Sequence, residues 1–305
     1  MRHSLRFPPA VLLVTACALW GAATVLNKAL LASINPVTLL VVQLAPSALF
    51  LWAAVLITAC PAPAKSYWLP LVALGVLNPG ISYTLNLMGL ASVSASVSTL
   101  LWAAEPLMIL GLAALVLGEK ITWRLLLVML LGGLGVALVA HVHGGLGDAI
   151  APQGMVLLLG AVLCCAFYTV FSRQLVESVD PVFTVALQQT AGLAWAVALL
   201  LVGTPFGSVD DIRAIPPATL VAAAISGLLY YAAAYWLYIA ALRWVPAAVA
   251  GSYFNVIPIF GVGLAYLFLG ETLTPVQWLG AGAILASTYA LVRLTNGMGS
   301  GRSAE

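Results

Sequence analysis

One carboxylate in this 305-residue chain lies far from any other charge in its segment: Glu105 interrupts the apolar run 95–117. That run is long enough to cross a bilayer as a helix, since about 20 apolar residues rising 1.5 Å each span the hydrocarbon. Glu105 is therefore predicted near mid-depth, where an ionisable group costs on the order of 2.5–3.5 kcal/mol on insertion scales. It can bind a proton that is exchanged during a cycle, because burial favours the neutral acid, or contact the amino group of a substrate. Anchoring a kinked helix is the structural alternative.

Polar and aromatic side chains recur at helical spacing in several other apolar runs. Trp20, Thr24 and Asn27 are four and three residues apart, which places them on one face of a helix. A cavity lined by aromatic rings and a few hydrogen-bonding groups suits a small amphiphile such as an amino acid. Hydrogen bonds between helices, worth about 0.6 kcal/mol each, are the alternative role for any one polar residue. The predicted substrate cavity contains Trp20, Thr24, Asn27, Tyr83, Asn86, Ser98, Trp102, Glu105, Tyr168, Tyr235, Tyr238 and Asn255.

Prolines interrupt two of the runs at corresponding positions. Pro106 and Pro258 each remove an N–H that would bond the carbonyl four residues earlier in a helix. Because transporters place gates at paired helix breaks, both prolines are predicted hinges, and a packing kink is the alternative. Another break is predicted at residues 78–80, with no counterpart in the second half of the chain, where Tyr230 and Tyr231 stand instead.

The composition is that of an integral membrane protein. Hydrophobic residues make up 63% of the chain and charged residues 7%, with a mean hydropathy of +1.12, whereas a soluble domain is about 25% charged. A net charge of +2 without a basic stripe argues against nucleic-acid binding. The cysteines lack metal-ligand spacing, so neither a metal nor a cofactor is predicted. No enzyme is predicted either, because the aspartates fall in loops and the histidines near run ends, which leaves no general base at depth.

Ten apolar runs, five in each half of the chain, predict ten transmembrane helices. Turn residues such as Asn35-Pro36 and Asp180-Pro181 separate them. The chain has no phosphate-binding loop for a pump and no ring of charges for a channel. The runs are residues 10–31, 37–59, 68–90, 95–117, 125–140, 154–171, 182–202, 218–240, 247–269 and 276–292.

The second set of runs repeats the first. Gly270-Glu271 follows Gly118-Glu119 by 152 residues, and Asp180-Pro181 follows Asn35-Pro36 by 145 residues. Because five is an odd number, the second set must cross the membrane in the opposite direction to the first. Inverted repeats of this kind are typical of secondary transporters.

Basic residues gather at one end of the runs. The inner end has Arg2, Arg6, Lys65, Lys120, Arg124, Arg173, Arg243, Arg293 and Arg302, and the outer end has Lys28 and Arg213. Cytoplasmic loops carry the excess of Lys and Arg, so this distribution predicts that both termini are cytoplasmic and that the linker 141–153 is outside.

These features resemble the drug/metabolite transporter superfamily, in particular its members with two EamA-type halves. The resemblance covers residues 11–293 and is carried by Ala18-Leu19-Trp20-Gly21, by Glu105-Pro106 and by the two Gly-Glu turns. It implies an all-α integral membrane protein in which two inverted five-helix repeats, residues 10–140 and 154–293, surround a central cavity. Residues 141–153 would form a periplasmic linker and residues 294–305 a cytoplasmic tail.

The resemblance also implies a function. Such proteins export small molecules across a bacterial-type inner membrane by alternating access, and the aromatic cavity is most similar to that of YddG-type exporters of aromatic and other neutral amino acids. An exporter of another metabolite or drug, and a membrane interaction protein without transport activity, are the alternatives. Proton coupling is left open. Glycines in the fifth and tenth runs predict close helix packing, so the expected state is a monomer or a weak dimer.

Overall fold

The computed structural model describes residues 8–117, 122–141, 152–175, 178–203, 210, 212–245, 250 and 253–300. Every secondary-structure element within these residues is a helix, and each of the ten predicted runs falls on helical backbone in its described part. Six helical stretches are long and apolar enough to cross a membrane, and three shorter apolar helices coincide with the fourth, fifth and ninth runs. Of the two Gly-Glu turns, the structure describes the second: Glu119 lies outside the described residues, and Glu271 lies within them.

The first half begins with two helices that have proline at the start, where the missing N–H removes no intrahelical hydrogen bond. These are α1 (Pro9–Leu30) and α2 (Pro36–Ile57). The third span consists of η1 (Lys65–Tyr67), α3 (Trp68–Gly75), η2 (Val76–Ile81) and α4 (Ser82–Ser92). The fourth is divided into α5 (Ala95–Trp102) and α6 (Glu105–Leu117), and the fifth is α7 (Trp123–His141).

The second half repeats this pattern of whole and divided spans. It consists of α8 (Pro152–Leu175), α9 (Pro181–Val202), η3 (Ile212–Ala214), α10 (Pro217–Gly227), η4 (Leu228–Ala234), α11 (Tyr235–Leu242), η5 (Tyr253–Val256), α13 (Ile257–Leu269) and α14 (Pro275–Ser300). The last helix runs well beyond its predicted end at residue 292. The tail predicted to begin at residue 294 is therefore helical as far as Ser300.

The third and eighth spans each contain a π-helical turn at the same place in the repeat. η2 begins at Val76 and η4 begins at Leu228, 152 residues later. The break itself has no counterpart, as expected, because Asn78 is extended (φ -148°, ψ 117°) whereas the backbone of η4 stays helical. Pro79, which follows a cis peptide bond, is replaced by Tyr231 in the second half, where only the π-helical turn recurs. Such turns often occur at functional sites, and both of these contain buried residues, among them Asn78 and Pro79 in η2 and Tyr230 and Tyr231 in η4.

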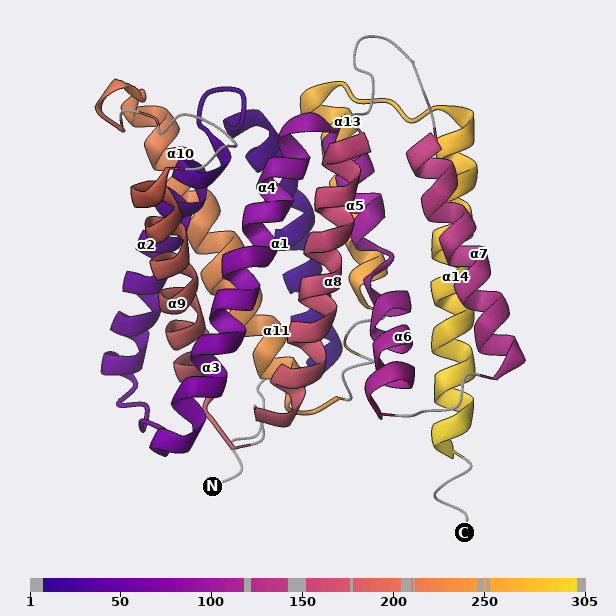
Figure 1. Cartoon of the computed structure of the whole chain (residues 1–305), viewed down its shortest axis with the longest axis horizontal. Helices are drawn as coiled ribbons and strands as arrows, with labels where there is room; N and C mark the ends of the chain where they lie inside the picture. Colours follow the sequence, from indigo (N-terminus) through magenta and orange to yellow (C-terminus); the bar gives the residue numbers. More distant parts are fainter. Residues whose placement is uncertain are drawn as a thin grey trace.

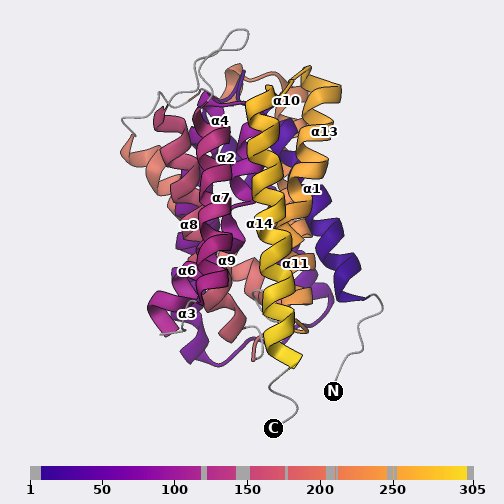
Figure 2. The same cartoon turned by 90° about the vertical axis from the view of Figure 1, so that its right-hand side faces the viewer.

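Helices of the two halves pack against each other throughout the bundle (Figures 1 and 2). α2 packs against α9, α1 against α13, α4 against α8, and α7 against α14. Two glycines permit the closest approaches, because a Cβ on Gly75 would clash with the backbone of Gln188 and one on Gly227 with the backbone of Gln43. These contacts are equivalent in the repeat, since the glycines are 152 residues apart and the glutamines 145 apart.

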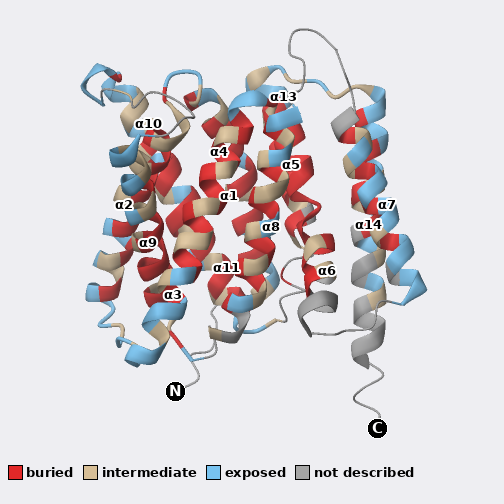
Figure 3. Cartoon of the chain, viewed as in Figure 1, coloured by how far each residue is buried: buried red, intermediate tan, exposed pale blue. Residues whose placement is uncertain are grey.

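α7 and α14 form a pair at one side of the bundle (Figure 1). Their backbones meet closely at Gly135 and Gly280, where a Cβ on Gly135 would lie 2.8 Å from the Gly280 carbonyl oxygen. Helix packing within the chain was predicted for these glycines and is confirmed for this pair, whereas Gly133 and Gly282 face open space. The buried residues concentrate in the remaining helices (Figure 3).

Acidic side chains join the two halves at the end of the bundle where α1 ends. The Asp210 carboxylate accepts hydrogen bonds from the backbone N–H and the side-chain amide of Asn35, both at 2.6 Å. Glu271 accepts from the backbone N–H groups of Ala95 and Ser96 at 2.8 Å and from the Ser96 hydroxyl at 2.7 Å. Each carboxylate thus lies at the start of a first-half helix, where the free N–H groups and the helix dipole favour negative charge.

Candidate functional site

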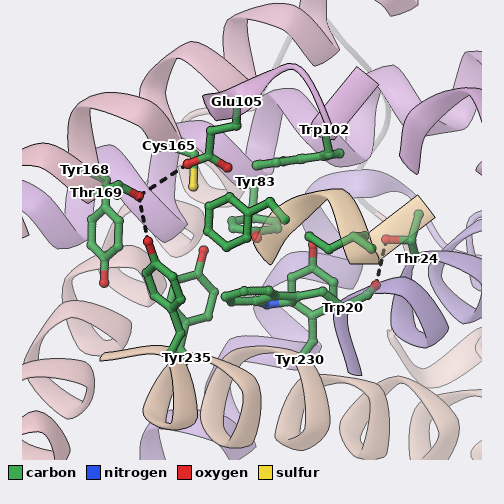
Figure 4. A pocket seen from close by; sticks show the side chains of 13 residues that line it. Trp20, Thr24, Tyr83, Trp102, Glu105, Cys165, Tyr168, Thr169, Tyr230 and Tyr235 are labelled. Atoms are coloured by element: carbon green, nitrogen blue, oxygen red, sulfur yellow. Dashed lines mark hydrogen bonds between the residues drawn. The ribbon is translucent and has the colours of Figure 1, made fainter. Parts of the chain in front are cut away.

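A cavity lies in the middle of the bundle, between helices of both halves (Figure 4). The side chains leave about 390 Å³ unfilled by atoms, a volume that includes space open to solvent. Every lining residue is less than a tenth exposed, so the walls are almost wholly buried in this conformation. The lining residues are Trp20, Thr24, Tyr83, Trp102, Glu105, Cys165, Tyr168, Thr169, Tyr230, Tyr235, Tyr238, Phe254 and Ile257.

Eight aromatic rings form most of the cavity wall. Trp20 makes edge contacts with Tyr235 and Phe254 at centroid distances of 5.2 and 5.6 Å. Tyr83 lies nearly parallel to Trp102 at 5.9 Å and edge-on to Tyr230 at 5.1 Å. Rings in such arrangements attract one another through their quadrupoles and hold each other in place. The wall is therefore a preformed apolar surface with hydroxyl groups at its tyrosines.

Glu105 is the carboxylate of this cavity, and a break in the fourth span positions it. α5 ends at Trp102 and α6 begins at Glu105, with Pro106 in the first turn, where proline is tolerated. The acid thus stands at the N-terminus of α6, where the helix dipole favours negative charge. The Thr169 hydroxyl donates to Glu105 Oε1 at 3.3 Å and lies 3.3 Å from the Tyr238 hydroxyl.

The lining residues come largely in equivalent pairs. An offset of 145 residues relates the wall positions on α1 to those on α8, and an offset of 152 relates those on α4, α5 and α6 to those on the eighth and ninth spans. Both members of each pair line the same cavity. The pairs are Trp20 with Cys165, Thr24 with Thr169, Tyr83 with Tyr235, Trp102 with Phe254, and Glu105 with Ile257. The cavity is therefore built from the same places in both halves.

Comparison with known proteins assigns this architecture. The EamA-like transporter family matches the chain twice, over residues 8–140 and again over residues 152–293. The chain belongs to the EamA-like transporter family. It is a multi-pass membrane transporter and not an enzyme, and the predicted membership of the drug/metabolite transporter superfamily is confirmed.

Relatives of this EamA-family transporter are themselves named as transporters. The "Uncharacterized transporter YvbV" of Bacillus subtilis (strain 168) is 27% identical over 274 residues, covering 87% of this chain and 85% of the relative. The "Uncharacterized transporter YwfM" of the same organism is 28% identical over 127 residues, covering 42% and 41%. A solved crystal structure superposes with a TM-score of 0.69 at 16% identity, covering 95% of this chain and 97% of that one, which shows a shared fold. The closer similarity to YddG-type exporters stays a prediction.

Most of the side chains predicted for the cavity of this EamA-family transporter lie in its wall. These are Trp20, Thr24, Tyr83, Trp102, Glu105, Tyr168, Tyr235 and Tyr238. Asn86 stands behind the wall, where its side-chain oxygen accepts from Trp102 Nε1 at 2.9 Å. Ser98 is fully buried on α5 and is not among the lining residues. The backbone of Asn255 lies in η5, and its side chain is outside what the structure describes.

Asn27 belongs to a separate polar cluster. Its side-chain oxygen accepts from Gln43 Nε2 at 2.6 Å and from the Ser226 hydroxyl at 2.8 Å, which ties α1 to α2 and α10. The hydrogen-bonding alternative considered for each polar residue therefore describes Asn27. Pro106 and Pro258 each lie in the first turn of the helix that follows a break, as the hinge prediction requires, and their movement stays a prediction.

Helical spacing within single runs missed five lining residues. These are Cys165, Thr169, Tyr230, Phe254 and Ile257. The repeat held the missing signal, because four of them are the equivalents of Trp20, Thr24, Trp102 and Glu105. The fifth, Tyr230, lies in η4, whose irregular backbone no residue pattern in the eighth span indicated. Among the described residues, no group of three His, Cys, Asp or Glu side chains could hold a metal ion.

Proposed function

We propose that this transporter exports small metabolites bearing an amino group, aromatic and other neutral amino acids among them, from the cytoplasm across an inner membrane. The observation that carries the proposal is the cavity, which combines eight aromatic rings with a buried carboxylate at the junction of the two halves. Pockets that bind small molecules are mostly apolar with a few placed polar groups, as this one is. Transport would proceed by alternating access, with movement at the breaks that precede Pro106 and Pro258.

The proposed topology is ten spans in two inverted five-helix repeats. Contacts at the end of the bundle support it, because Asp210 before the eighth span meets Asn35 at the start of α2, and Glu271 after the ninth meets Ala95 at the start of α5. The eighth span therefore starts at the end where α1 finishes. Counting back two spans, the sixth runs opposite to the first, as inverted halves require.

The aromatic rings would hold the apolar body of the substrate and Glu105 its polar end. Glu105 either contacts the amino group or carries a proton that is exchanged for the substrate. A Glu105→Gln variant separates these roles, because it cannot ionise but keeps the shape and hydrogen bonds of the neutral acid. A purely proton-carrying Glu105 predicts that exchange survives and only the response to a pH gradient is lost, whereas contact with the amino group predicts that exchange itself falls.

Counterflow into liposomes containing the purified protein tests the proposal. Vesicles preloaded with one unlabelled amino acid or amine at a time should accumulate its labelled form above the level of protein-free vesicles. A folded, reconstituted protein that exchanges no member of an amino-acid and amine panel would contradict the proposed substrate class.

Thiol labelling tests the proposed orientation. Ser33 and Ser66 are both exposed, the first in the loop after α1 and the second in η1, between α2 and α3. In a variant without native cysteines, Ser33→Cys should react with an impermeant reagent in intact cells and Ser66→Cys only after the cells are opened. The reverse pattern would place both termini outside.

A further inference from the structure

The described wall of the cavity contains an acidic residue but no basic one. Glu105 is 1% exposed and faces the cavity, and no Lys, Arg or His is among the described residues that line it. A buried carboxylate without a cationic partner is costly, because neither water nor a fixed countercharge compensates it. A positively charged ligand would supply that partner.

The surroundings of the carboxyl group suit an ammonium ion. Figure 4 shows the Glu105 carboxyl between Thr169 and Trp102, on the same side of the cavity as the ring of Tyr83. Aromatic faces attract cations through their quadrupoles, most strongly at sites withdrawn from water, and cages of such rings recognise ammonium groups. A carboxylate surrounded by indole and phenol rings therefore provides both kinds of attraction to one positive charge.

An amino acid meets an obstacle in the same place. Its ammonium group can pair with Glu105, but its own carboxylate must then lie in the same closed space as the Glu105 carboxylate. The described wall offers that second anion only neutral donors, such as tyrosine hydroxyls and the Trp20 indole N–H, which has no partner among the described residues. Neutral donors do not replace the hydration of an anion or offset repulsion at low dielectric.

We propose that the cavity selects organic monocations with an aromatic or apolar body, such as primary arylalkylamines, over zwitterionic amino acids with the same body. This inference rests on the proposed function, since it names the preferred members of the amino-bearing substrates. The aromatic wall contacts the body, Glu105 pairs with the ammonium group, and the absence of a second fixed charge rejects the carboxylate.

Three probes that share one phenol ring test the charge preference directly. They are tyramine, a monocation, tyrosine, a zwitterion, and 3-(4-hydroxyphenyl)propionate, an anion. Binding to the purified full-length protein at neutral pH is measured by calorimetry and by competition in counterflow. Tyramine should bind at least about tenfold more tightly than tyrosine, since desolvated cation–aromatic and charge contacts both favour it. The propionate should bind most weakly.

Two variants show whether Glu105 is the cause. Glu105→Gln should weaken tyramine binding by about tenfold or more and bring it close to that of tyrosine. Asp180→Asn is the matched control, because it also removes one negative charge, lies at the N-cap of α9 away from the cavity wall, and leaves a residue that caps helices well. It should leave the preference unchanged. Glu105→Asp, which retains the charge, replaces Glu105→Gln if the latter does not fold, and should keep the order of the probes.

The possible failures are distinguishable. Tyrosine binding as tightly as tyramine, or a preference that persists in Glu105→Gln, overturns the cation selectivity and leaves the proposed function standing. A folded protein that binds none of the three probes and exchanges no amino acid overturns both.

Discussion

The two halves build the cavity with the same backbone but with different side chains. Spans four and nine break just before Glu105-Pro106 and Ile257-Pro258, and spans three and eight both contain a π-helical turn. At the cavity, however, the equivalent of Glu105 is Ile257. The break in span nine forms without a carboxylate, which favours a functional role for Glu105 over one in holding the break. The difference teaches that the breaks belong to the shared scaffold, whereas the chemistry of the cavity belongs to one half.

Of the predicted changes, removal of the carboxylate should have the largest effect on transport. Glu105→Ile, which makes the two positions identical, should lower counterflow of tyramine by roughly 100-fold, because removing one partner of a buried charge pair costs about 2–5 kcal/mol. Adding Ile257→Glu should restore part of that activity, since position 257 faces the same cavity. Glu105→Ile with wild-type activity would show that the asymmetry has no function.

Because the two halves share their backbone, substitution of equivalent glycines should cost the protein equal stability. Gly75→Ala and Gly227→Ala should each destabilise the protein by about 1–3 kcal/mol, because the new methyl group meets the backbone of Gln188 or Gln43. Thermal unfolding in detergent measures this. Gly263→Ala is the control, because a Cβ there meets nothing within 4 Å. If one of the two variants unfolded at the wild-type temperature and the other failed to fold, the two glycine contacts would not be equivalent.

A smaller effect is expected at the paired aromatic positions. Trp102→Phe gives the first half the residue type found at Phe254, and leaves Asn86 without the indole donor it has at 2.9 Å. Loss of one such hydrogen bond is worth about 1 kcal/mol, so transport should show a roughly fivefold higher KM. Trp102→Ala and Tyr83→Ala should reduce transport further while folded protein remains in the membrane. Unchanged kinetics in all three variants would assign these rings to packing.

The mildest change concerns the contact of Glu271 with the start of α5. Glu271→Gln keeps a hydrogen-bond acceptor but loses the charge, and charge near a helix N-terminus is worth about 0.3–1 kcal/mol. We expect this contact to help close its end of the bundle, so Cys165 in the cavity, kept as the sole cysteine, should react about two to five times faster with a thiol reagent from that side. An unaltered rate would show that this contact does not hold the end closed.

The sequence predicts the spans and one face of each helix well, for a physical reason. Apolar length and helical period are local properties, so the face carrying Trp20 and Thr24 can be found from α1 alone. Which helix that face meets is not local, and Asn27 on the same face therefore pairs with Gln43 and Ser226 instead of lining the cavity. The repeat offset is the one long-range signal in the sequence, and it leads from Trp102 to Phe254.

The backbone of the eighth span could not be predicted from its sequence. Pro79 marks the break in η2, but no proline marks the equivalent turn in η4, where Tyr231 occupies that place. The turn there packs against α2, and Gly227, which ends α10 just before the turn, lies close to Gln43 of α2. Tyr230 enters the cavity because of this turn, and regular helical spacing could not have placed it there.

The acidic contacts at the end of the bundle have a consequence for how the protein can vary. Glu271 accepts from the backbone N–H groups of Ala95 and Ser96, which every residue except proline supplies, so these two hydrogen bonds do not depend on the donors' side chains. The acceptor, by contrast, is a side chain, and only another acid of similar reach can replace it without loss of the charge. Substitutions of Glu271 should therefore disturb this contact between the halves more than substitutions at Ala95 or Ser96 that leave the backbone N–H groups in place.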